Sequence, residues 1–364
     1  MRLAVDIGGT FTDVTVFDEA TGSVQLGKAL STPADLVEGV MAAVGRATDS
    51  PAAADLIIHG STIVINAILE RKGARTALIT TRGFRDVYEI GRINRPESFN
   101  LFFRKHRPLI PRDLVFEVPE RMLADGAEEA PLDESTAREV VRGLRKLGVE
   151  AVAIMFLHSY RTPAHEVRMR DIVREEAPHL FVTASHELSR EYREYERTST
   201  VAANAYVGPM VSRYLGELEQ RLQNDGFAGG LMIMQSSGGL SDVATARQQC
   251  IQMMESGPAG GVVGSIAICE TLGVTEAICF DMGGTTAKAC VVRRGVPDVS
   301  PDYFVGGYNE GLAIRIPVLD IKEVGTGGGS IAWVDEGGGL HVGPRALEPS
   351  PAQSATAVAA QTRR

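Results

Sequence analysis

The chain has 364 residues, of which 44% are hydrophobic and 23% are charged, and its formal net charge is −9 at pH 7. This composition is typical of a globular protein with room for two or three domains. The acidic balance disfavours nucleic-acid binding as the main activity. No apolar run is long enough to cross a bilayer, and the first residues predict a strand, not a signal peptide. Because the four cysteines lack metal-type spacing, we expect reduced thiols and a cytoplasmic protein with no membrane partner.

The first thirteen residues predict a strand, a tight glycine turn and a second strand. Backbone N–H groups at a glycine tip can surround an anion, and a carboxylate beside that anion can serve Mg²⁺ or an attacking oxygen. On its own, the pattern is equally compatible with an ordinary hairpin. The apolar run 3–5 is followed by Asp6, then by the turn residues Gly8, Gly9 and Thr10, then by Thr12 and a second apolar run at 14–17.

The intervening chain alternates helical and strand patterns, as in an α/β protein. Ser31, Thr32 and Pro33 predict the cap of a helix that ends near residue 46. The basic, aromatic stretch 92–112 has no periodicity and predicts a long functional loop. The other expected elements are strands at 56–59, 76–80, 149–156, 181–184 and 232–234, and helices at 63–71, 133–147 and 163–176.

A long helix is expected to run through residue 224, preceded by dense charges between Glu187 and Arg197. We interpret these charges as a solvated helix face. The small residues that follow Ser256 predict a helix reaching residue 272, either packed closely against another helix or in contact with a phosphate.

The strand–Asp–x–Gly–Gly–Thr pattern then occurs a second time. Two such hairpins are hard to explain as unrelated turns. We therefore predict two similar lobes, each of which offers a phosphate-binding hairpin to a shared cleft. Here the apolar run 277–280 is followed by Asp281, by the turn residues Gly283, Gly284, Thr285 and Thr286, and by Lys288; a glycine loop comes later, with Gly325, Gly327, Gly328 and Gly329.

Six segments resemble the hydantoinase A/5-oxoprolinase family, which belongs to the actin, sugar-kinase and heat-shock-chaperone ATPase superfamily. The segments are DIGGTFTD at 6–13, HGSTIVINAILERKGARTALITTRGFRDVYEIGR at 59–92, MQSSGG at 234–239, ESGPAGG at 255–261, DMGGTTAK at 281–288 and GTGGGSIAWVD at 325–335. The resemblance implies an α/β fold of two ribonuclease-H-like lobes around a nucleotide cleft.

The resemblance places the first lobe at 1–185 and the second at 186–344. The stretch 345–364 has no apolar period, so we expect a tail that is disordered or unrelated to the family. Family chains run far beyond residue 344. The second lobe is therefore expected to be incomplete, with an exposed apolar face.

The family resemblance implies a hydrolase that opens a cyclic amide, of the hydantoin or 5-oxoproline class, at the expense of ATP. Phosphorylation of the amide oxygen makes that oxygen a good leaving group, and the protein's task is positioning and charge neutralisation. The chain would be the ATP-binding subunit beside a hydantoinase B-like subunit. The alternatives are an ATP-dependent ketone carboxylase subunit and a catalytically impaired nucleotide-binding remnant.

By position, the resemblance assigns Asp6 and Asp281 to Mg²⁺ and its water network. It assigns the hairpin residues Gly8, Gly9, Thr10, Thr12, Gly283, Gly284, Thr285 and Thr286 to the phosphates of ATP, and Gly325, Gly327, Gly328 and Gly329 to the adenosine side. Many family members have Ser-Thr-Asp after the second Gly-Gly-Thr, so Lys288 is either near a phosphate or a plain surface lysine.

Weaker candidates for the substrate pocket are His59, Thr62, Asn66 and Arg92. A satisfied core or capping histidine is an equally good interpretation of His59. His158 and His165 have no carboxylate or cysteine partners at ligand spacing, so we expect no structural zinc.

Overall fold

The computed structural model describes residues 1–9, 11–32, 35–92, 97–283, 286–307, 311–325 and 327–346. The fold is mixed α/β, as predicted, and the contacts divide it into two compact units. The large unit comprises Met1–Gly260 and Ser300–Val318, and the small unit comprises Gly261–Val299 and the chain from Leu319 onward. The lobe boundary expected near residue 185 stays a prediction, and it differs from the bounds of these units. Thr10, Gly284, Thr285 and the expected tail beyond residue 346 lie outside the described residues.

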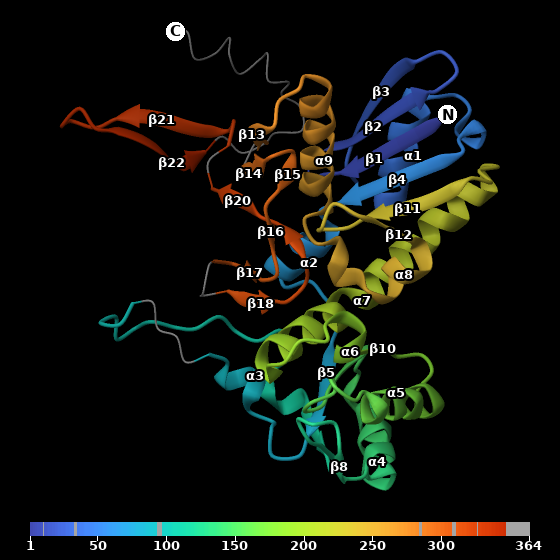
Figure 1. Cartoon of the computed structure of the whole chain (residues 1–364), viewed down its shortest axis with the longest axis vertical. Helices are drawn as coiled ribbons and strands as arrows, with labels where there is room; N and C mark the ends of the chain where they lie inside the picture. Colours follow the sequence, from blue (N-terminus) through green and yellow to red (C-terminus); the bar gives the residue numbers. More distant parts are fainter. Residues whose placement is uncertain are drawn as a thin grey trace. The chain divides into compact units, whose positions relative to one another are not determined.

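The large unit contains a six-stranded sheet with the order β12-β11-β4-β1-β2-β3 (Figure 1). The first three strands form an antiparallel meander, while β4 and β11 run parallel to β1. Along β1, the apolar side chains of Leu3, Val5 and Ile7 are buried and the intervening residues are exposed, which is the period of a strand with one face on the core. The bounds are β1 Arg2–Ile7, β2 Phe11–Asp18, β3 Ser23–Leu30, β4 Leu56–Ser61, β11 Gly230–Met234 and β12 Leu240–Asp242.

The helix predicted after Ser31 begins later than its expected cap. Helix α1 (Leu36–Ala47) is capped by Asp35, whose Oδ1 accepts a hydrogen bond from the Glu38 N–H at 3.0 Å. The prediction that Ser31 and Thr32 cap this helix is therefore wrong. The physical reason is that the first turn of α1 begins at Leu36, so Asp35 is in the position to accept from its N–H groups; the Ser31 Oγ instead donates to the Gly8 carbonyl oxygen at 2.8 Å.

A second sheet of the large unit has the order β10-β9-β5-β6, and its neighbouring strands are parallel. All residues of β5 and β9 are buried, as expected for a parallel sheet covered on both faces. Its strands are β5 Thr76–Thr81, β6 Val115–Val118, β9 Ala151–Met155 and β10 Phe181–Ala184, and two of its helices are α4 Glu134–Leu144 and α5 Ala164–Glu176.

The long helix α7 (Glu194–Asn224) contributes to two hydrophobic cores. Val201, Ala202 and Ala205 belong to the core of the second sheet, whereas Val207 and Val211 belong to the core of the first. The helix therefore joins both halves of the large unit. The remaining helices are α2 Ile63–Leu69, α3 Val87–Ile90, α6 Ser185–Leu188, α8 Val243–Gln248 and α9 Ser256–Thr271, with 3₁₀ turns at Pro51–Ala53, Arg112–Leu114, Arg145–Leu147 and Cys250–Met253.

The charges that lead into α7 are solvated only in part: those at 190–193 are exposed, but the interpretation is wrong for two charges inside the first turn of the helix. Glu196 and Arg197 are 8% and 1% exposed. Their burial is possible because each has a charged partner: Arg92 for Glu196, and Glu166 for Arg197. Sequence spacing gave no sign of these partners, because both come from distant segments of the chain.

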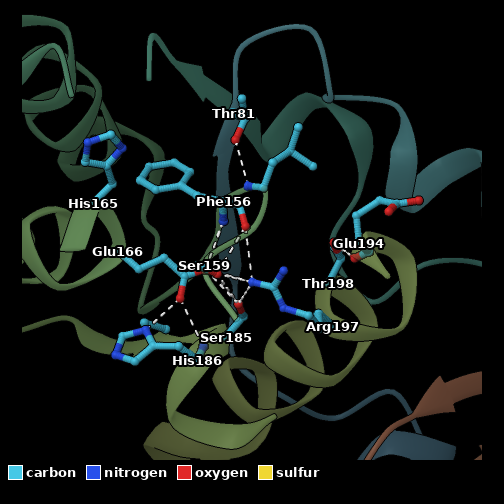
Figure 2. Close-up of polar contacts among 12 residues, drawn as sticks. Thr81, Phe156, Ser159, His165, Glu166, Ser185, His186, Glu194, Arg197 and Thr198 are labelled. Carbon is cyan, nitrogen blue, oxygen red and sulfur yellow. Dashed lines mark hydrogen bonds and ion pairs between the residues drawn. The ribbon is translucent and has the colours of Figure 1, made fainter. Parts of the chain in front are cut away.

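Glu166 is the centre of a buried polar cluster, shown in Figure 2. Its Oε1 accepts hydrogen bonds from the Phe156 N–H at 2.9 Å and from the hydroxyls of Ser159 and Ser185 at 2.7 Å each. Its Oε2 accepts from the N–H and the Nδ1 of His186 at 3.0 and 2.7 Å. The cluster ties α5 to α6 and to the chain after β9.

Arg197 completes this cluster from α7. Its Nη2 lies 3.3 Å from Glu166 Oε1, donates to the Phe156 carbonyl oxygen at 3.1 Å and also contacts Ser159 and Ser185 (Figure 2). Burial alone would raise the pKa of Glu166, but the hydrogen bond from His186 and the charge of Arg197 hold it below its usual value. Glu166 is therefore a fully buried carboxylate that is ionised and multiply hydrogen-bonded.

His165 has the carboxylate partners that sequence spacing did not reveal. Its Nδ1 lies 2.8 Å from Glu120 Oε2 and its Nε2 lies 3.3 Å from Glu128 Oε2. The hydrogen bond to Glu120 raises the pKa of His165 above its ordinary value. A histidine with a raised pKa stabilises the fold fully below its unfolded pKa, about 6.5, and this contribution is lost as the pH rises through the folded pKa.

We therefore expect His165→Gln to destabilise the protein more at about pH 5.5 than at about pH 9. Urea unfolding at the two pH values measures the difference. His179→Gln is the matched control, because His179 is exposed. Equal losses for His165→Gln at both pH values would contradict the assigned protonation.

The small unit contains a sheet in which β13 pairs with β14, and β14 pairs with β15 and β20, all antiparallel. On β13, the side chains of Ile278, Phe280 and Met282 are each more than half exposed, which agrees with the expected apolar face. The strands are β13 Glu276–Met282, β14 Ala287–Arg293, β15 Val296–Pro297, β20 Ile321–Val324, β21 Ser330–Val334 and β22 Leu340–Ala346.

Short strands complete the described structure, and no helix within the described ranges has the length and apolar character needed to cross a membrane. These strands are β7 Arg121–Met122, β8 Glu128–Ala130, β16 Val299–Ser300, β17 Tyr303–Val305, β18 Leu312–Ile314 and β19 Val318–Leu319.

Candidate functional site

The first predicted site residue, Asp6, lies at the carboxyl end of β1 with its side chain on the exposed face of the sheet. Parallel pairing with β4 places Gly60 beside Asp6 and Ser61 beside Ile7. The hairpin closes just beyond, where the Gly8 N–H donates to the Phe11 carbonyl oxygen at 2.9 Å. The alternation of buried and exposed side chains along β1 thus directs the Asp6 carboxylate to the exposed face. The glycine turn begins two residues later, at Gly8.

Two glycines far from Asp6 in sequence leave room for its carboxylate. A Cβ atom on Gly257 would lie 2.6 Å from Asp6 Oδ1, and a Cβ atom on Gly60 would lie 3.3 Å from the same oxygen. Real Cβ atoms do not approach an oxygen to 2.6 Å, so Gly257 permits an approach that no other residue would. The sequence predicted that the small residues after Ser256 serve helix packing or phosphate contact. The structure gives Gly257 a different neighbour, the Asp6 side chain.

The start of α9 is fixed to the end of β4 by Ser256. Its Oγ donates to the Ser61 carbonyl oxygen at 3.0 Å and accepts from the Ser61 N–H at 2.9 Å. These buried bonds hold the first turn of α9 beside Asp6. The partial positive charge of a helix N-terminus favours an adjacent carboxylate. The element that faces Asp6 is therefore both positioned and electrostatically complementary.

Three further predicted residues brace the same end of the sheet. Thr62 donates its N–H and its hydroxyl to the Ile7 carbonyl oxygen at 3.0 and 3.2 Å, and Asn66 Nδ2 donates to Thr62 Oγ1 at 3.1 Å. Thr12 is 1% exposed, and its hydroxyl lies 3.2 Å from Ser31 Oγ. The structure thus gathers Asp6, Gly8, Thr12, Thr62 and Asn66 at one edge.

His59 and Arg92 have other surroundings. His59 is fully buried; its Nε2 lies 2.9 Å from Tyr214 Oη, and burial lowers its pKa to about 4. This placement agrees with the core interpretation of His59. Arg92 forms a two-point ion pair with Glu196, with Nε to Oε1 at 2.8 Å and Nη2 to Oε2 at 2.5 Å.

The second predicted hairpin lies in the small unit, next to the glycine loop. Asp281 is exposed at the end of β13, and the Gly283 N–H donates to the Thr286 carbonyl oxygen at 3.0 Å. The Gly328 N–H donates to the Gly283 carbonyl oxygen at 2.8 Å. The loop itself turns through Gly327, whose N–H donates to Ser330 Oγ at 3.0 Å. The predicted second hairpin and late glycine loop are therefore in direct contact.

Lys288 lies opposite Asp281 in the β13–β14 register. Its side chain is 16% exposed, with Nζ 3.6 Å from Glu323 Oε2 on β20. Lys288 therefore lies beside the second hairpin, largely buried and close to a carboxylate. It is not a plain surface lysine.

The residues proposed for Mg²⁺ are oxygen donors of the kind that this ion prefers. Asp6 and Asp281 both have exposed side chains, and each is the last residue but one of a strand that leads into a glycine turn. In the described part of the chain, no group of three or more His, Cys, Asp or Glu side chains is arranged to hold a metal ion. An ion held largely through water, phosphate and one or two carboxylates needs no such group.

Two family models together match most of the chain: the hydantoinase/oxoprolinase N-terminal region at residues 2–177 and hydantoinase/oxoprolinase at residues 197–359. The chain belongs to the hydantoinase/oxoprolinase family. The second match extends into 345–359, within the stretch for which no family likeness was expected.

Comparison with individual proteins gives the same family. The chain is 35% identical to caprolactamase subunit alpha of Pseudomonas jessenii, over 96% of this chain and 51% of that one. It is 32% identical to 5-oxoprolinase of Saccharomyces cerevisiae, over 97% of this chain and 30% of that one. The crystal structure of the ATP-dependent caprolactamase has a TM-score of 0.82 at 34% identity, covering 95% of this chain and 51% of that chain.

A nucleotide-free structure of acetone carboxylase, from work on ATP-dependent acetone carboxylation, has a TM-score of 0.80 at 28% identity, over 95% of this chain and 51% of that chain. The chain spans about half the length of the caprolactamase and acetone carboxylase chains. These relatives use ATP on cyclic amides and on a ketone.

Proposed function

We propose that this chain is the ATP-binding part of an enzyme that opens a cyclic amide, of the hydantoin or 5-oxoproline class. The observation that carries the proposal is the geometry around Asp6. An exposed carboxylate at a strand end, beside a glycine turn, is held where Gly60 and Gly257 keep side chains away. Phosphoryl transfer needs this combination of backbone donors, open approach and a carboxylate for the metal. The caprolactamase and 5-oxoprolinase relatives supply the substrate class.

The fold supports a ribonuclease-H-like nucleotide-binding lobe for the large unit. Its sheet has an antiparallel meander, β1 to β3, followed by β4 and β11 parallel to β1. The second Asp–Gly–Gly hairpin and the adjoining loop at Gly328 support a matching role for the small unit. In this proposal, the two units are the bodies of the two lobes of one nucleotide site.

In the proposed reaction, the γ-phosphoryl group passes from ATP to the amide oxygen, and ADP leaves. Mg²⁺ would neutralise phosphate charge when bound, with Asp6 and Asp281 as its carboxylates. The N–H groups of the two hairpin tips bind the phosphates, and Gly257 leaves room for the Asp6 carboxylate to face them. The phosphorylated amide is a better electrophile, so water adds to its carbon and the ring C–N bond breaks, with a proton going to the nitrogen. The acyl phosphate that remains is hydrolysed by a second water to the carboxylate and inorganic phosphate.

A second candidate is a subunit of an ATP-dependent ketone carboxylase, favoured by the match to the acetone carboxylase structure. The same phosphate-binding parts would serve, because an enolate oxygen would take the place of the amide oxygen. In either case we propose a partner subunit, as the name caprolactamase subunit alpha implies for that relative. ADP release on 5-oxoproline, hydantoin, caprolactam and acetophenone with bicarbonate, with and without the partner, separates the two candidates.

Binding of Mg·ATP should stabilise the fold by about 1–3 kcal/mol at saturating ligand, because a ligand that binds only the folded state shifts unfolding by mass action. Asp6→Ala should reduce this stabilisation. Asp18→Ala, at the far end of β2, is the matched control and should leave it unchanged. Thermal unfolding with and without Mg·ATP measures the effect. An unchanged melting temperature of the wild-type chain would remove the nucleotide assignment.

A further inference from the structure

A cavity in the large unit shares no residue with the Asp6 edge. Its volume is about 360 Å³, and it opens to solvent between α5, α6 and α8. We call it the Arg190 pocket, and it is lined by Arg170, His186, Glu187, Arg190, Gln248 and Gln249. All the lining residues have polar or charged side chains, so the pocket suits a charged or strongly hydrogen-bonding molecule better than an apolar one.

The two arginines make the pocket cationic. Arg190 is exposed, and it has no ion-pair or hydrogen-bond partner in the described part of the chain. Arg170 pairs with Glu187, with Nη1 to Oε1 at 2.5 Å, but its Nε is buried without a hydrogen-bond partner. Arg170 Nη2 also lies 3.5 Å from Asp171 Oδ1, so Arg190 is the guanidinium of the pocket whose charge is not offset by a carboxylate. A planar guanidinium matches carboxylate and phosphate oxygens in a two-point geometry.

His186 adds a polar ring atom from a rigid support. Its Nδ1 is 2.7 Å from the buried carboxylate of Glu166, so Nδ1 carries a proton and the ring is held in one orientation. Nε2 makes no hydrogen bond to any residue that the structure describes, and Figure 2 shows it on the side of the ring away from Glu166. With the proton on Nδ1, Nε2 accepts a hydrogen bond, for example from the P–OH group of inorganic phosphate.

Gln248 and Gln249, at the end of α8, also line the pocket. Gln249 Nε2 donates to the Glu187 carbonyl oxygen at 3.1 Å, which fixes that amide beside α6. The Gln248 side chain is exposed at the pocket rim. This part of the lining therefore offers amide donors next to the cationic groups, from an element that is held in place.

We propose that the Arg190 pocket binds a small anion of the carboxylate or phosphate class, with Arg190, Arg170 and His186 as its main ligands. The site is additional to the Asp6 edge and does not depend on the proposed enzymatic function. Its ligand is a separate small molecule, either a free phosphate compound or a small dicarboxylate.

Titration calorimetry on the full chain, with inorganic phosphate and with succinate as separate probes, tests the proposal. We expect saturable binding of at least one probe. Arg190→Ala should weaken it by about ten-fold or more, the effect of losing a charge-assisted hydrogen bond, and His186→Asn should weaken the binding of phosphate by a smaller factor. Asn keeps a donor near Glu166 and removes the position of Nε2, so the cluster is preserved. Far-UV circular dichroism checks that each variant is folded.

Arg174→Ala is the matched control, because Arg174 lies one turn after Arg170 on α5, is exposed and is not among the lining residues. It should leave the affinity unchanged. Binding of phosphate alone, of succinate alone or of both, lost in Arg190→Ala and kept in Arg174→Ala, supports the site and identifies its class. Absence of binding by both probes, or equal affinity in Arg190→Ala, overturns it. Asp6→Ala should not change the affinity, so this result stands apart from the ATP test.

Discussion

Glu166→Leu should lower the free energy of unfolding by about 3–5 kcal/mol, the cost of leaving one member of a buried ion pair without its partner. Arg197 would remain 1% exposed with no carboxylate to balance its charge. The Ser159 and Ser185 hydroxyls and the Phe156 N–H would also lose their acceptor. Urea unfolding followed by circular dichroism measures the loss, with wild-type protein in the same buffer.

Two further variants separate burial from charge. Glu175→Gln removes a carboxylate from the same helix, but Glu175 is exposed and its ion pairs with Arg138 and Arg168 are solvated, so stability should change little. Glu166→Leu combined with Arg197→Met should be less destabilising than Glu166→Leu alone, because no unpaired charge remains. If Glu166→Leu were as stable as wild type, the buried cluster would make no contribution to the stability of the fold.

The parts of the fold that the sequence predicted correctly depend on local signals. The first strand was predicted from the apolar run at Leu3 to Val5, and the turn from Gly8 and Gly9. The strand 181–184 and the helix that ends at residue 176 were placed within a residue of their observed bounds. In each of these segments, the period or the terminating residues lie within the element itself.

The sequence failed where the deciding partner is distant. The charges of Glu196 and Arg197 look like a solvated stripe until Arg92 and Glu166 are brought to them by tertiary packing. Nothing near His165 in the sequence pointed to Glu120, because His165 lies on α5 whereas Glu120 lies between β6 and β7, 45 positions earlier. Ser31 looked like a helix cap, but Asp35 is the cap that is used.

The sequence named the carboxylates and the glycine turns of the candidate site, but not the residues that pack around them. The repeated Asp-x-Gly-Gly-Thr pattern named Asp6 and Asp281, and the glycine loop at Gly328 was also named. The role of Gly257 was missed, because Gly257 and Asp6 are close in space but far apart in the sequence of the large unit. The available signal was the run of small residues after Ser256. Small residues indicate that another group packs closely against the helix, but they do not identify that group.

Gly257→Ala should lower ATP turnover by the complete enzyme about 10²- to 10³-fold, the range for losing one preorganised electrostatic contact in an active site. The added Cβ would lie 2.6 Å from Asp6 Oδ1 and 3.2 Å from Oδ2. The carboxylate must therefore rotate away from its position beside the first turn of α9. This expectation rests on the proposed function. The measurement is steady-state ADP release, with Mg·ATP stabilisation of the same variant as a second readout.

Gly261→Ala is the matched control on the same helix, because a Cβ there meets nothing within 4 Å. That variant should keep full turnover and gain up to about 1 kcal/mol of stability from the better helix propensity of alanine. Gly257→Ala should gain no such stability, since the same propensity is offset by the displaced carboxylate. Both variants should have wild-type far-UV circular dichroism. If Gly257→Ala turned over ATP as fast as Gly261→Ala, the position of Asp6 beside α9 would have no part in the reaction, and Asp6 would be an ordinary surface carboxylate at the end of a strand.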